Sequence, residues 1–420
     1  MKINNISPDH KADKSLRLAF LFLSILFFFY LFLKTNLYPR DYTYTEWFIN
    51  YEGGFVKRGL GGQIALEISN LVQLNLKLSI LLVQALGYLI FFYFFYKLIR
   101  GIHLNFFWYL IIFSPLLLMY PIFELEALGR KDIFVISCFL IFTFIKQNTK
   151  KLVIINFFIF FLLSSLIHEI TIFYIFHYSF IIFLKIKNLN QRISITNIFA
   201  IFLFVCALVF LNMYVSKFAN LDEMISAYSI HGLVSGIDIT TQSGSISWLK
   251  PSFKNILLGT INQISIDRIF RYILVYALAF SPFLFFLKGK NNLNKFLNIP
   301  LLVMLSFLIA MLMHLLIYDW GRIAYFTYNF FTIVIIAMFK NKLINEDFIN
   351  EKIQSLSKKI KIFIFVVCCF ALTPKLTITE SLSTIPYIKI SLKTIKEIIK
   401  LTKYENKFRY LNKNWKINVN

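Results

Sequence analysis

The sequence predicts an all-α polytopic membrane protein with about 10–11 transmembrane helices. Hydrophobic residues make up 58% of the 420 residues and charged residues only 15%, whereas soluble domains are nearer half apolar and a quarter charged. Several apolar runs reach the roughly 20 residues that cross a bilayer core. The candidate spans are 16–37, 78–96, 104–122, 133–145, 152–168, 170–184, 195–216, 269–287, 296–318, 323–339 and 360–373.

The first apolar run is expected to remain as a span. Leu18–Leu33 is too long for the apolar core of a cleavable signal, and no small-residue cleavage site follows it. The four cysteines all lie in apolar runs without metal-ligand spacing. We therefore expect neither a disulfide framework nor a metal.

Lysine and arginine residues predict the orientation, because short cytoplasmic loops carry an excess of both. A cytoplasmic N-terminus makes every second connection basic. These connections contain Lys97 and Arg100, then Lys146, Lys150 and Lys151, then Lys185, Lys187 and Arg192, then Lys288, Lys290 and Lys295, and finally Lys340 and Lys342. The run 152–184 is divided into two short spans meeting near His168 and Glu169, since one long helix would place Lys185 outside. The net charge of +23 is assigned to anchoring against anionic membrane lipid, and no nucleic-acid partner is expected.

This topology predicts one transmembrane domain, 1–373, followed by a basic tail, 374–420. Its two long outer loops, 38–77 and 217–268, balance acidic against basic residues. The side of the membrane on which the tail lies stays open, because 360–373 fits either an eleventh span or a peripheral helix.

Four polar clusters interrupt the apolar sequence, and the predicted topology places all of them on the outer face. Charged groups cost about 2.5–3.5 kcal/mol each at the centre of a membrane helix, so they are usually retained for a site or an aqueous cavity. Together they predict a single outward-facing site. The clusters are "YEGGFVKRGLGG" (51–62), "FELEALGRKDIF" (123–134), "LIHEITIF" (166–173) and "IYDWGRIAYF" (317–326).

Three arginines, Arg58, Arg130 and Arg322, are candidates to hold a lipid diphosphate, because guanidinium groups bind phosphate through paired hydrogen bonds, and Lys57 is a further candidate beside Arg58. Each has a structural alternative. Arg58 and the adjacent Lys57 would snorkel at the interface, Arg130 would balance nearby acids at a helix end, and Arg322 would pair with Asp319 at i, i+3.

The glycine-rich stretch 49–65 contains five of the 14 glycines in the chain. Gly53 and Gly54 would allow backbone N–H groups to approach phosphate oxygens, or would form a tight re-entry turn. A Walker-type phosphate loop is excluded by the spacing.

His168 and Glu169 lie at the apex of a very apolar hairpin. Partial burial suits such a carboxyl group to proton transfer near neutral pH, whereas the structural alternative is a satisfied helix end. Glu169 is the first candidate for a base and Glu52 the second, and His168 and Asp319 complete the candidate catalytic set.

In order and spacing, "NYEGGFVKRGLGG", "GRKD" about seventy residues later, "HE" and "DWGR" resemble motifs of the divergent Wzy-type O-antigen and capsule repeat-unit polymerases. The resemblance covers these motifs, the size and the span number, and Lys57 stands where a second arginine is expected. It implies a glycosyltransferase of the bacterial inner membrane, similar to the glycosyltransferase C architecture. Such an enzyme polymerises undecaprenyl-diphosphate-linked repeat units of lipopolysaccharide O-antigen or capsule, beside a repeat-unit flippase and a chain-length regulator. The resemblance implies no cofactor and no metal.

Two alternatives stay open. A glycosyltransferase that uses a polyprenyl-monophosphate sugar commonly has an acidic pair in its first outer loop, for which Asp41 and Glu46 are available. A lipid-linked glycan flippase would place charged residues at mid-membrane depth and often has internal repeats, and no inverted repeat is visible in the sequence.

Overall fold

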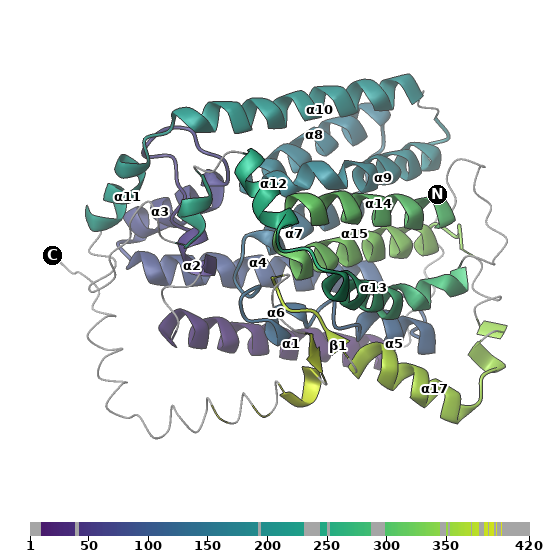
Figure 1. Cartoon of the computed structure of the whole chain (residues 1–420). Helices are drawn as coiled ribbons and strands as arrows, with labels where there is room; N and C mark the ends of the chain where they lie inside the picture. Colours follow the sequence, from purple (N-terminus) through teal and green to yellow (C-terminus); the bar gives the residue numbers. More distant parts are fainter. Residues whose placement is uncertain are drawn as a thin grey trace.

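The chain folds almost entirely into helices that lie side by side in one bundle (Figure 1). The computed structural model describes residues 10–37, 42–191, 195–230, 244–249, 253–286 and 299–344 and, further on, 350–351, 353–370, 372–377, 382–384, 386–389, 392 and 396. The predicted acid Asp41, the middle of the second long loop and most of the basic tail lie outside these residues.

The first half of the chain contains α1 to α9 and one 3₁₀ helix. The bounds are α1 His10–Leu37, α2 Tyr42–Glu46, α3 Gly59–Val72, α4 Leu76–Ile99, α5 Phe106–Ile112, α6 Tyr120–Phe123, α7 Asp132–Phe144, α8 Lys150–Ile167, η1 Glu169–Tyr174 and α9 Ile175–Asn188. Asn75, Asn105 and Thr149 cap α4, α5 and α8 by accepting backbone N–H groups of the first turn, the arrangement favoured at helix starts.

The second half adds the remaining helices and a short hairpin. The bounds are α10 Ile195–Val215, η2 Ser216–Phe218, α11 Leu221–Ile230, η3 Gly244–Leu249, α12 Phe253–Ile261, α13 Ile266–Phe280, η4 Ser281–Phe286, α14 Ile299–Leu316, α15 Trp320–Lys340, α17 Lys358–Phe365, the π-helical η5 Val366–Phe370, β1 Leu372–Thr373 and β2 Ser383–Thr384. The two strands pair antiparallel, Leu372 opposite Thr384.

These features define an all-α polytopic membrane protein. Among the described residues, five helices are long and apolar enough to cross a membrane, or six if the bent pair Phe202–Phe218 and Leu221–Ala227 is one span. Helix α15 is the central one, since nearly all its residues are buried, as expected for a helix that is apolar on every side. It lies between α7, α9 and α14 in Figure 1.

Of two further predictions about the spans, one is confirmed and the other is wrong. The predicted hairpin at His168–Glu169 is present: α8 ends at Ile167, and Lys185 near the end of α9 donates to Gln147 Oε1 at 2.8 Å, close to the start of α8. The predicted span 104–122 is broken, because α5 ends at Ile112. Pro115 explains the break, since proline has no N–H and disfavours helical backbone in the residue before it.

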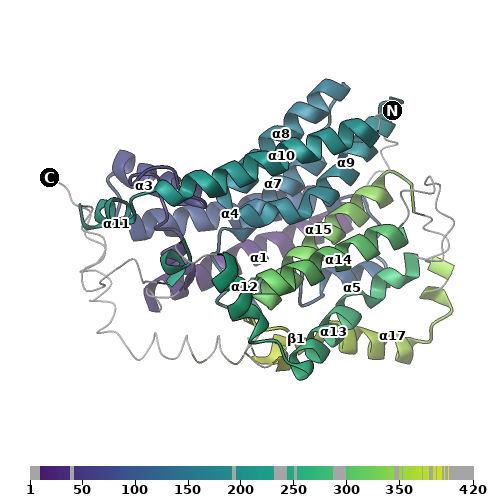
Figure 2. The same ribbon diagram turned by 45° about the horizontal axis from the view of Figure 1, so that its top comes forward.

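The bundle has two chemically different ends. In Figures 1 and 2, α3 and α11 lie together at one end, opposite the N-terminus. Near the N-terminal end, Lys340 at the end of α15 reaches the carbonyl oxygen of Lys97 at the end of α4, at 3.4 Å. The connections that were predicted to be basic lie at this end of the bundle. The polar sequence clusters lie toward the other end.

The chain after α15 returns toward the cluster end. Asn350 bonds Asn105 at the start of α5, and Cys369 contacts the carbonyl oxygen of Leu110 further along that helix. Leu376 then accepts a hydrogen bond from Gly321 N, at 3.0 Å, in the first turn of α15. The described residues after α15 thus lie first beside α5 and then beside the first turn of α15, and whether 360–373 is an eleventh span or a peripheral helix stays a prediction.

Candidate functional site

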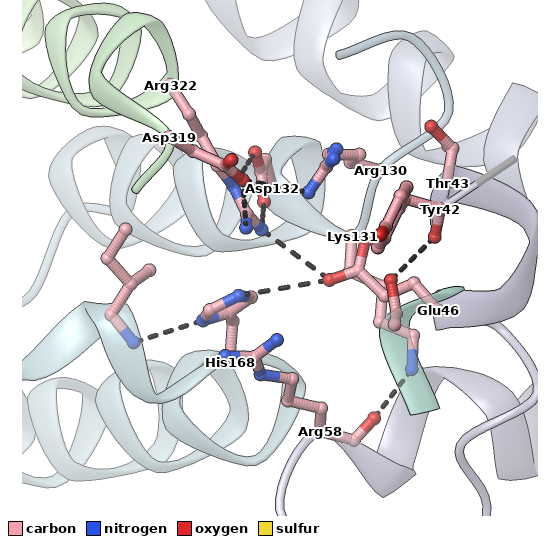
Figure 3. Close-up of polar contacts among 12 residues, drawn as sticks. Tyr42, Thr43, Glu46, Arg58, Arg130, Lys131, Asp132, His168, Asp319 and Arg322 are labelled. Carbon is pink, nitrogen blue, oxygen red and sulfur yellow. Dashed lines mark hydrogen bonds and ion pairs between the residues drawn. The ribbon is translucent and has the colours of Figure 1, made fainter. Parts of the chain in front are cut away.

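Five segments distant in sequence bring nine polar residues into one buried or partly buried group, here called the charge cluster; Figure 3 shows all of them except Glu169. They come from α2, from the loop before α3, from the start of α7, from the α8–η1 junction and from the start of α15. Four are basic and four are acidic, so the formal charges cancel, and one histidine joins them. The members are Glu46, Arg58, Arg130, Lys131, Asp132, His168, Glu169, Asp319 and Arg322.

The loop 123–131 is fixed to the α1–α2 region by buried hydrogen bonds. Lys34, at the end of α1, donates to the carbonyl oxygen of Leu128 at 2.9 Å and to Thr43 Oγ1 at 2.7 Å. Trp47 donates to the carbonyl oxygen of Gly129 at 2.7 Å. Gly129 has a φ of +78°, which glycine adopts without strain. These contacts place Arg130, Lys131 and Asp132 beside α2.

Arg58 and Glu169 form a bidentate ion pair. Arg58 Nε lies 2.8 Å from Glu169 Oε2 and 3.0 Å from Oε1, and Nη2 also contacts Oε1. Their side chains are 18% and 16% exposed, so this pair reaches the surface of the protein. Arg58 itself has a left-handed backbone, with φ +65° and ψ +10°.

Lys131 supports the backbone of Arg58. Its Nζ donates to the carbonyl oxygen of Arg58 at 2.6 Å and lies 5.6 Å from the ring centroid of Trp47. Burial lowers the pKa of Lys131 to about 7, although the carboxylate of Glu46 opposes the shift. A fully buried lysine is thus held where it loses its proton easily.

Arg322 lies at the centre of the cluster. Its Nε is 2.6 Å from Asp132 Oδ2, and its Nη2 contacts Asp132 Oδ1 and lies 3.5 Å from Glu46 Oε1. Asp319 is held more loosely, at 3.4 Å from Arg130 Nη1 and 3.8 Å from Arg322 Nη1, and its side chain is 20% exposed.

Glu46 is the least engaged acid of the cluster. It is completely buried, and among the described residues neither carboxylate oxygen has a hydrogen-bond partner. Its nearest charged neighbours are Arg322 and His168, whose Nε2 is 3.8 Å from Oε1. Burial acts to raise the pKa of Glu46, but the positive charges of Arg322, Arg130, Lys131 and Arg58 together lower it below its ordinary value.

Glu46, Asp132 and His168 offer three atoms within 4.8 Å of one another, a spacing that a metal ion could bridge. The donor chemistry does not fit. His168 Nδ1 accepts a hydrogen bond from the backbone N–H of Ile170 at 3.2 Å, so a neutral imidazole has its proton on Nε2, the atom that faces Glu46. The guanidinium of Arg322 already bonds Asp132 and approaches Glu46. Asp132 and Glu46 are instead paired with the guanidinium group of Arg322.

The structure brings together six of the residues predicted for the site: Arg58, Arg130, Arg322, His168, Glu169 and Asp319. Lys57 is half-buried beside Arg58, and burial lowers its pKa. Glu52 is exposed, and its carboxylate accepts a hydrogen bond from Gln63 at 3.0 Å instead of contacting the cluster.

Gly53 and Gly54 pack against the second long loop. A Cβ at Gly53 would lie 1.9 Å from the backbone oxygen of Asn220, and Asn220 N donates to the carbonyl oxygen of Gly53 at 2.7 Å. Gly54 has a φ of +99°. Close backbone packing thus accounts for both glycines, and their contact with phosphate stays a prediction.

Sequence reasoning did not assign a site role to Lys131 or Asp132 and placed Glu46 only in an alternative function. One signal was available for the first two: "GRKD" puts three charges in succession at the entrance of an apolar helix. Glu46 lies in a five-residue helix with no periodicity to reveal its burial.

No family model matches this sequence, and no curated protein and no solved structure matches the chain.

Proposed function

We propose that this protein is a bacterial inner-membrane glycosyltransferase that polymerises undecaprenyl-diphosphate-linked repeat units into O-antigen or capsular polysaccharide. One observation carries the proposal: three arginines and four carboxylates from distant segments meet in one buried cluster near one end of a membrane bundle. Buried charges of this kind are costly and are usually retained for chemistry.

Transfer from a lipid diphosphate requires positive charge where the leaving group departs, since this electrostatic stabilisation is usually the largest catalytic contribution. The contacts that Arg130 and Arg322 make with the partly exposed Asp319 are long, at 3.4 Å and 3.8 Å. A diphosphate would replace that carboxylate and gain charge-assisted hydrogen bonds from both guanidinium groups. Arg58, whose pair with Glu169 also reaches the surface, would bind a second phosphate oxygen.

The orientation belongs to the same proposal. The basic ends of α4, α9 and α15 would lie at the cytoplasmic face, which leaves the charge cluster toward the outer face. Lipid-linked repeat units are presented there after transport. A repeat-unit flippase and a chain-length regulator are the expected partners.

A second candidate is a glycosyltransferase with a polyprenyl-monophosphate sugar donor. The specific observation in its favour is Glu46, an acid of the first long loop that lies inside the cluster. The two candidates differ in the donor, so the donor requirement separates them.

The test is transfer by the purified protein in lipid nanodiscs. Synthetic polyprenyl-diphosphate repeat units should be joined into longer chains, whereas polyprenyl-monophosphate sugars should not serve as donors. Transfer only from the monophosphate would establish the second candidate. A protein that moves lipid-linked glycan across vesicles without forming a new bond would overturn both.

Arginine-to-lysine variants test the diphosphate contacts, because lysine keeps the charge but loses the paired donors. Arg58→Lys, Arg130→Lys and Arg322→Lys should each reduce chain extension by about 10- to 100-fold, the effect of losing one charge-assisted hydrogen bond. Arg17→Lys is the control, since Arg17 is 68% exposed in the N-terminal part of α1. Wild-type chain lengths in all three cluster variants would contradict the proposed contacts.

A further inference from the structure

The acids of the charge cluster differ in how much of their hydrogen-bonding capacity is used. Asp132 is bonded by Arg322, Glu169 is bonded at both oxygens by Arg58, and Asp319 contacts two arginines. Glu46 is completely buried, yet among the described residues neither of its oxygens accepts a hydrogen bond. An unsatisfied buried carboxylate is costly, and such groups are retained where a ligand completes them.

The histidine beside Glu46 has a fixed tautomer. His168 lies at the junction of α8 and η1, where its Nδ1 accepts the backbone N–H of Ile170 at 3.2 Å. Burial, with Arg58 nearby, lowers the pKa of His168 well below its ordinary value, so the ring is neutral. The proton is therefore on Nε2, 3.8 Å from Glu46 Oε1, and Nε2 has no other hydrogen-bond partner among the described residues.

These two residues face each other across a gap slightly longer than a hydrogen bond (Figure 3). Contacts of catalytic groups are often long before the substrate binds and then shorten. His168 lies between Glu46 and the partly exposed pair of Glu169 and Arg58, because its Nδ1 is 3.5 Å from Glu169 Oε2.

We propose that Glu46 is the catalytic base of this site and that His168 is the positioning residue that orients it. The inference rests on the proposed function. The acceptor is a sugar hydroxyl of one lipid-linked glycan, and the donor is a second glycan attached to a lipid diphosphate.

The step is a direct displacement. The hydroxyl oxygen attacks the anomeric carbon and forms the new glycosidic C–O bond, while the C–O bond to the diphosphate breaks and its electron pair leaves with the lipid diphosphate. The hydroxyl proton moves to Glu46, which later releases it to water. A single displacement inverts the configuration of the anomeric carbon.

Donor binding would also activate this base. Against the effect of burial, the positive charges of Arg322, Arg130, Lys131 and Arg58 lower the pKa of Glu46. A bound diphosphate neutralises those positive charges, so the pKa of Glu46 rises and the carboxylate becomes a stronger proton acceptor only once the donor is present.

The experiment compares Glu46→Gln with wild type in the nanodisc transfer assay. We expect kcat to fall by about 10²- to 10⁴-fold, the usual effect of removing a general base, with little change in KM for the lipid-diphosphate donor. Glu67→Gln is the matched control, because Glu67 is exposed in α3 and contacts only Gln63 among the interactions described. If the glutamine variant does not fold, Glu46→Asp, which keeps the charge but withdraws it by one methylene, should fold and show the same loss of kcat.

The role of His168 is tested by two amide variants. Asparagine keeps an acceptor near Nδ1 for Ile170 but removes the donor facing Glu46, whereas glutamine places a donor near Nε2. His168→Asn should therefore lose about 10- to 100-fold in kcat, and His168→Gln should recover much of it at similar thermal stability. Equal activity in both variants would show that His168 acts only as a helix cap.

The outcomes distinguish the inference from the function on which it rests. No transfer by the wild-type protein from any lipid-diphosphate donor overturns the proposed function. Transfer by wild type and by Glu46→Gln at similar rates, or a product with retained anomeric configuration, overturns only the assignment of Glu46.

Discussion

At the scale of single residues, this protein is dominated by charges that are buried with their partners. Removing a charge from water costs several kcal/mol, and only close pairing and hydrogen bonding repay it. Arg322 illustrates the balance, since it is nearly inaccessible and contacts Asp132, Glu46 and Asp319 together. Function and stability therefore depend on the same contacts, and variants must be chosen to separate them.

The pair Arg322–Asp132 should show strong coupling. Arg322→Ala leaves two buried carboxylates without their cation, so we expect a loss of about 3–5 kcal/mol in the free energy of unfolding. Arg322→Ala combined with Asp132→Ala should cost clearly less than the sum of the two single variants. Thermal unfolding in detergent measures the cycle, and additive costs would show that the pair contributes no interaction energy.

Lys131 predicts a pH dependence of stability. Its pKa is about 7 in the folded protein and about 10.4 when unfolded. Between these values the unfolded chain binds the extra proton, so stability rises as pH rises above 7. Below pH 7 lysine is protonated in both states and the cost is constant.

Lys131→Met should reduce the increase in Tm between pH 7 and pH 9, because methionine fills much of the same space without a titrating group, and the remaining increase includes Lys57, whose pKa burial also lowers. The measurement is thermal unfolding at each pH. His168 does not interfere, since its lowered pKa affects stability only below its unfolded value of about 6.5. An unchanged pH profile would mean that another group titrates in this window.

At the scale of elements, the glycine-rich stretch works as a packing device. Helix α3 approaches the backbone of the preceding segment so closely that a Cβ at Gly62 would lie 2.0 Å from the carbonyl oxygen of Ile49 and 2.6 Å from that of Trp47. Trp47 in turn donates a hydrogen bond to the carbonyl oxygen of Gly129. The close packing at the glycines therefore fixes the positions of Arg58 and Glu46 relative to the loop before α7. The glycines therefore contribute to the site by allowing these backbone segments to pack closely.

Gly62→Ala should destabilise the protein by about 1–3 kcal/mol, the usual cost of overpacking, because rigid backbone atoms stand in the way. Gly259→Ala is the matched control: this glycine lies in α12 with nothing within 4 Å of its added Cβ. Alanine there should be neutral or stabilise the helix by about 0.5–1 kcal/mol. Equal effects in the two variants, read from thermal unfolding, would refute the packing account.

At the scale of the whole molecule, the two ends of the bundle separate two kinds of charge. Acidic and basic side chains are paired in the cluster, whereas Lys97 and Lys340 lie together near the N-terminal end of the bundle. Lys375, on the segment that returns after α17, lies 2.9 Å from Glu124 and so belongs to the cluster end. Whether the segment 358–373 crosses the membrane decides on which side of it Lys375 lies.

Single cysteines in a variant without the four native ones test this arrangement. Glu52→Cys and Lys375→Cys should react with a membrane-impermeant maleimide from the same side, and Lys151→Cys only from the opposite side. The proposed orientation makes the first side the outer one. Labelling of the Lys375→Cys variant together with the Lys151→Cys variant would show that the segment 358–373 does not cross.

Hydropathy and motif spacing were enough to predict the class of protein, most helix positions and the gathering of the polar motifs. Membrane insertion and orientation depend on the hydropathy of short segments and on the lysine and arginine residues beside them. Because these are local properties, α8 and α9 could be predicted with their junction at His168. The span 104–122 was predicted as continuous, although Pro115 is a local signal for the break that follows α5.

The pairing of individual charges could not be predicted before the fold was known. Arg58 pairs with Glu169, 111 positions away, and Arg322 with Asp132, 190 positions away, and nothing in local periodicity specifies such partners. The same holds for Glu46, whose burial depends on α15, on the loop before α7 and on His168 together. Long-range electrostatic pairing is a property of the assembled fold, because the free energy of a buried charge depends on neighbours that folding alone brings near.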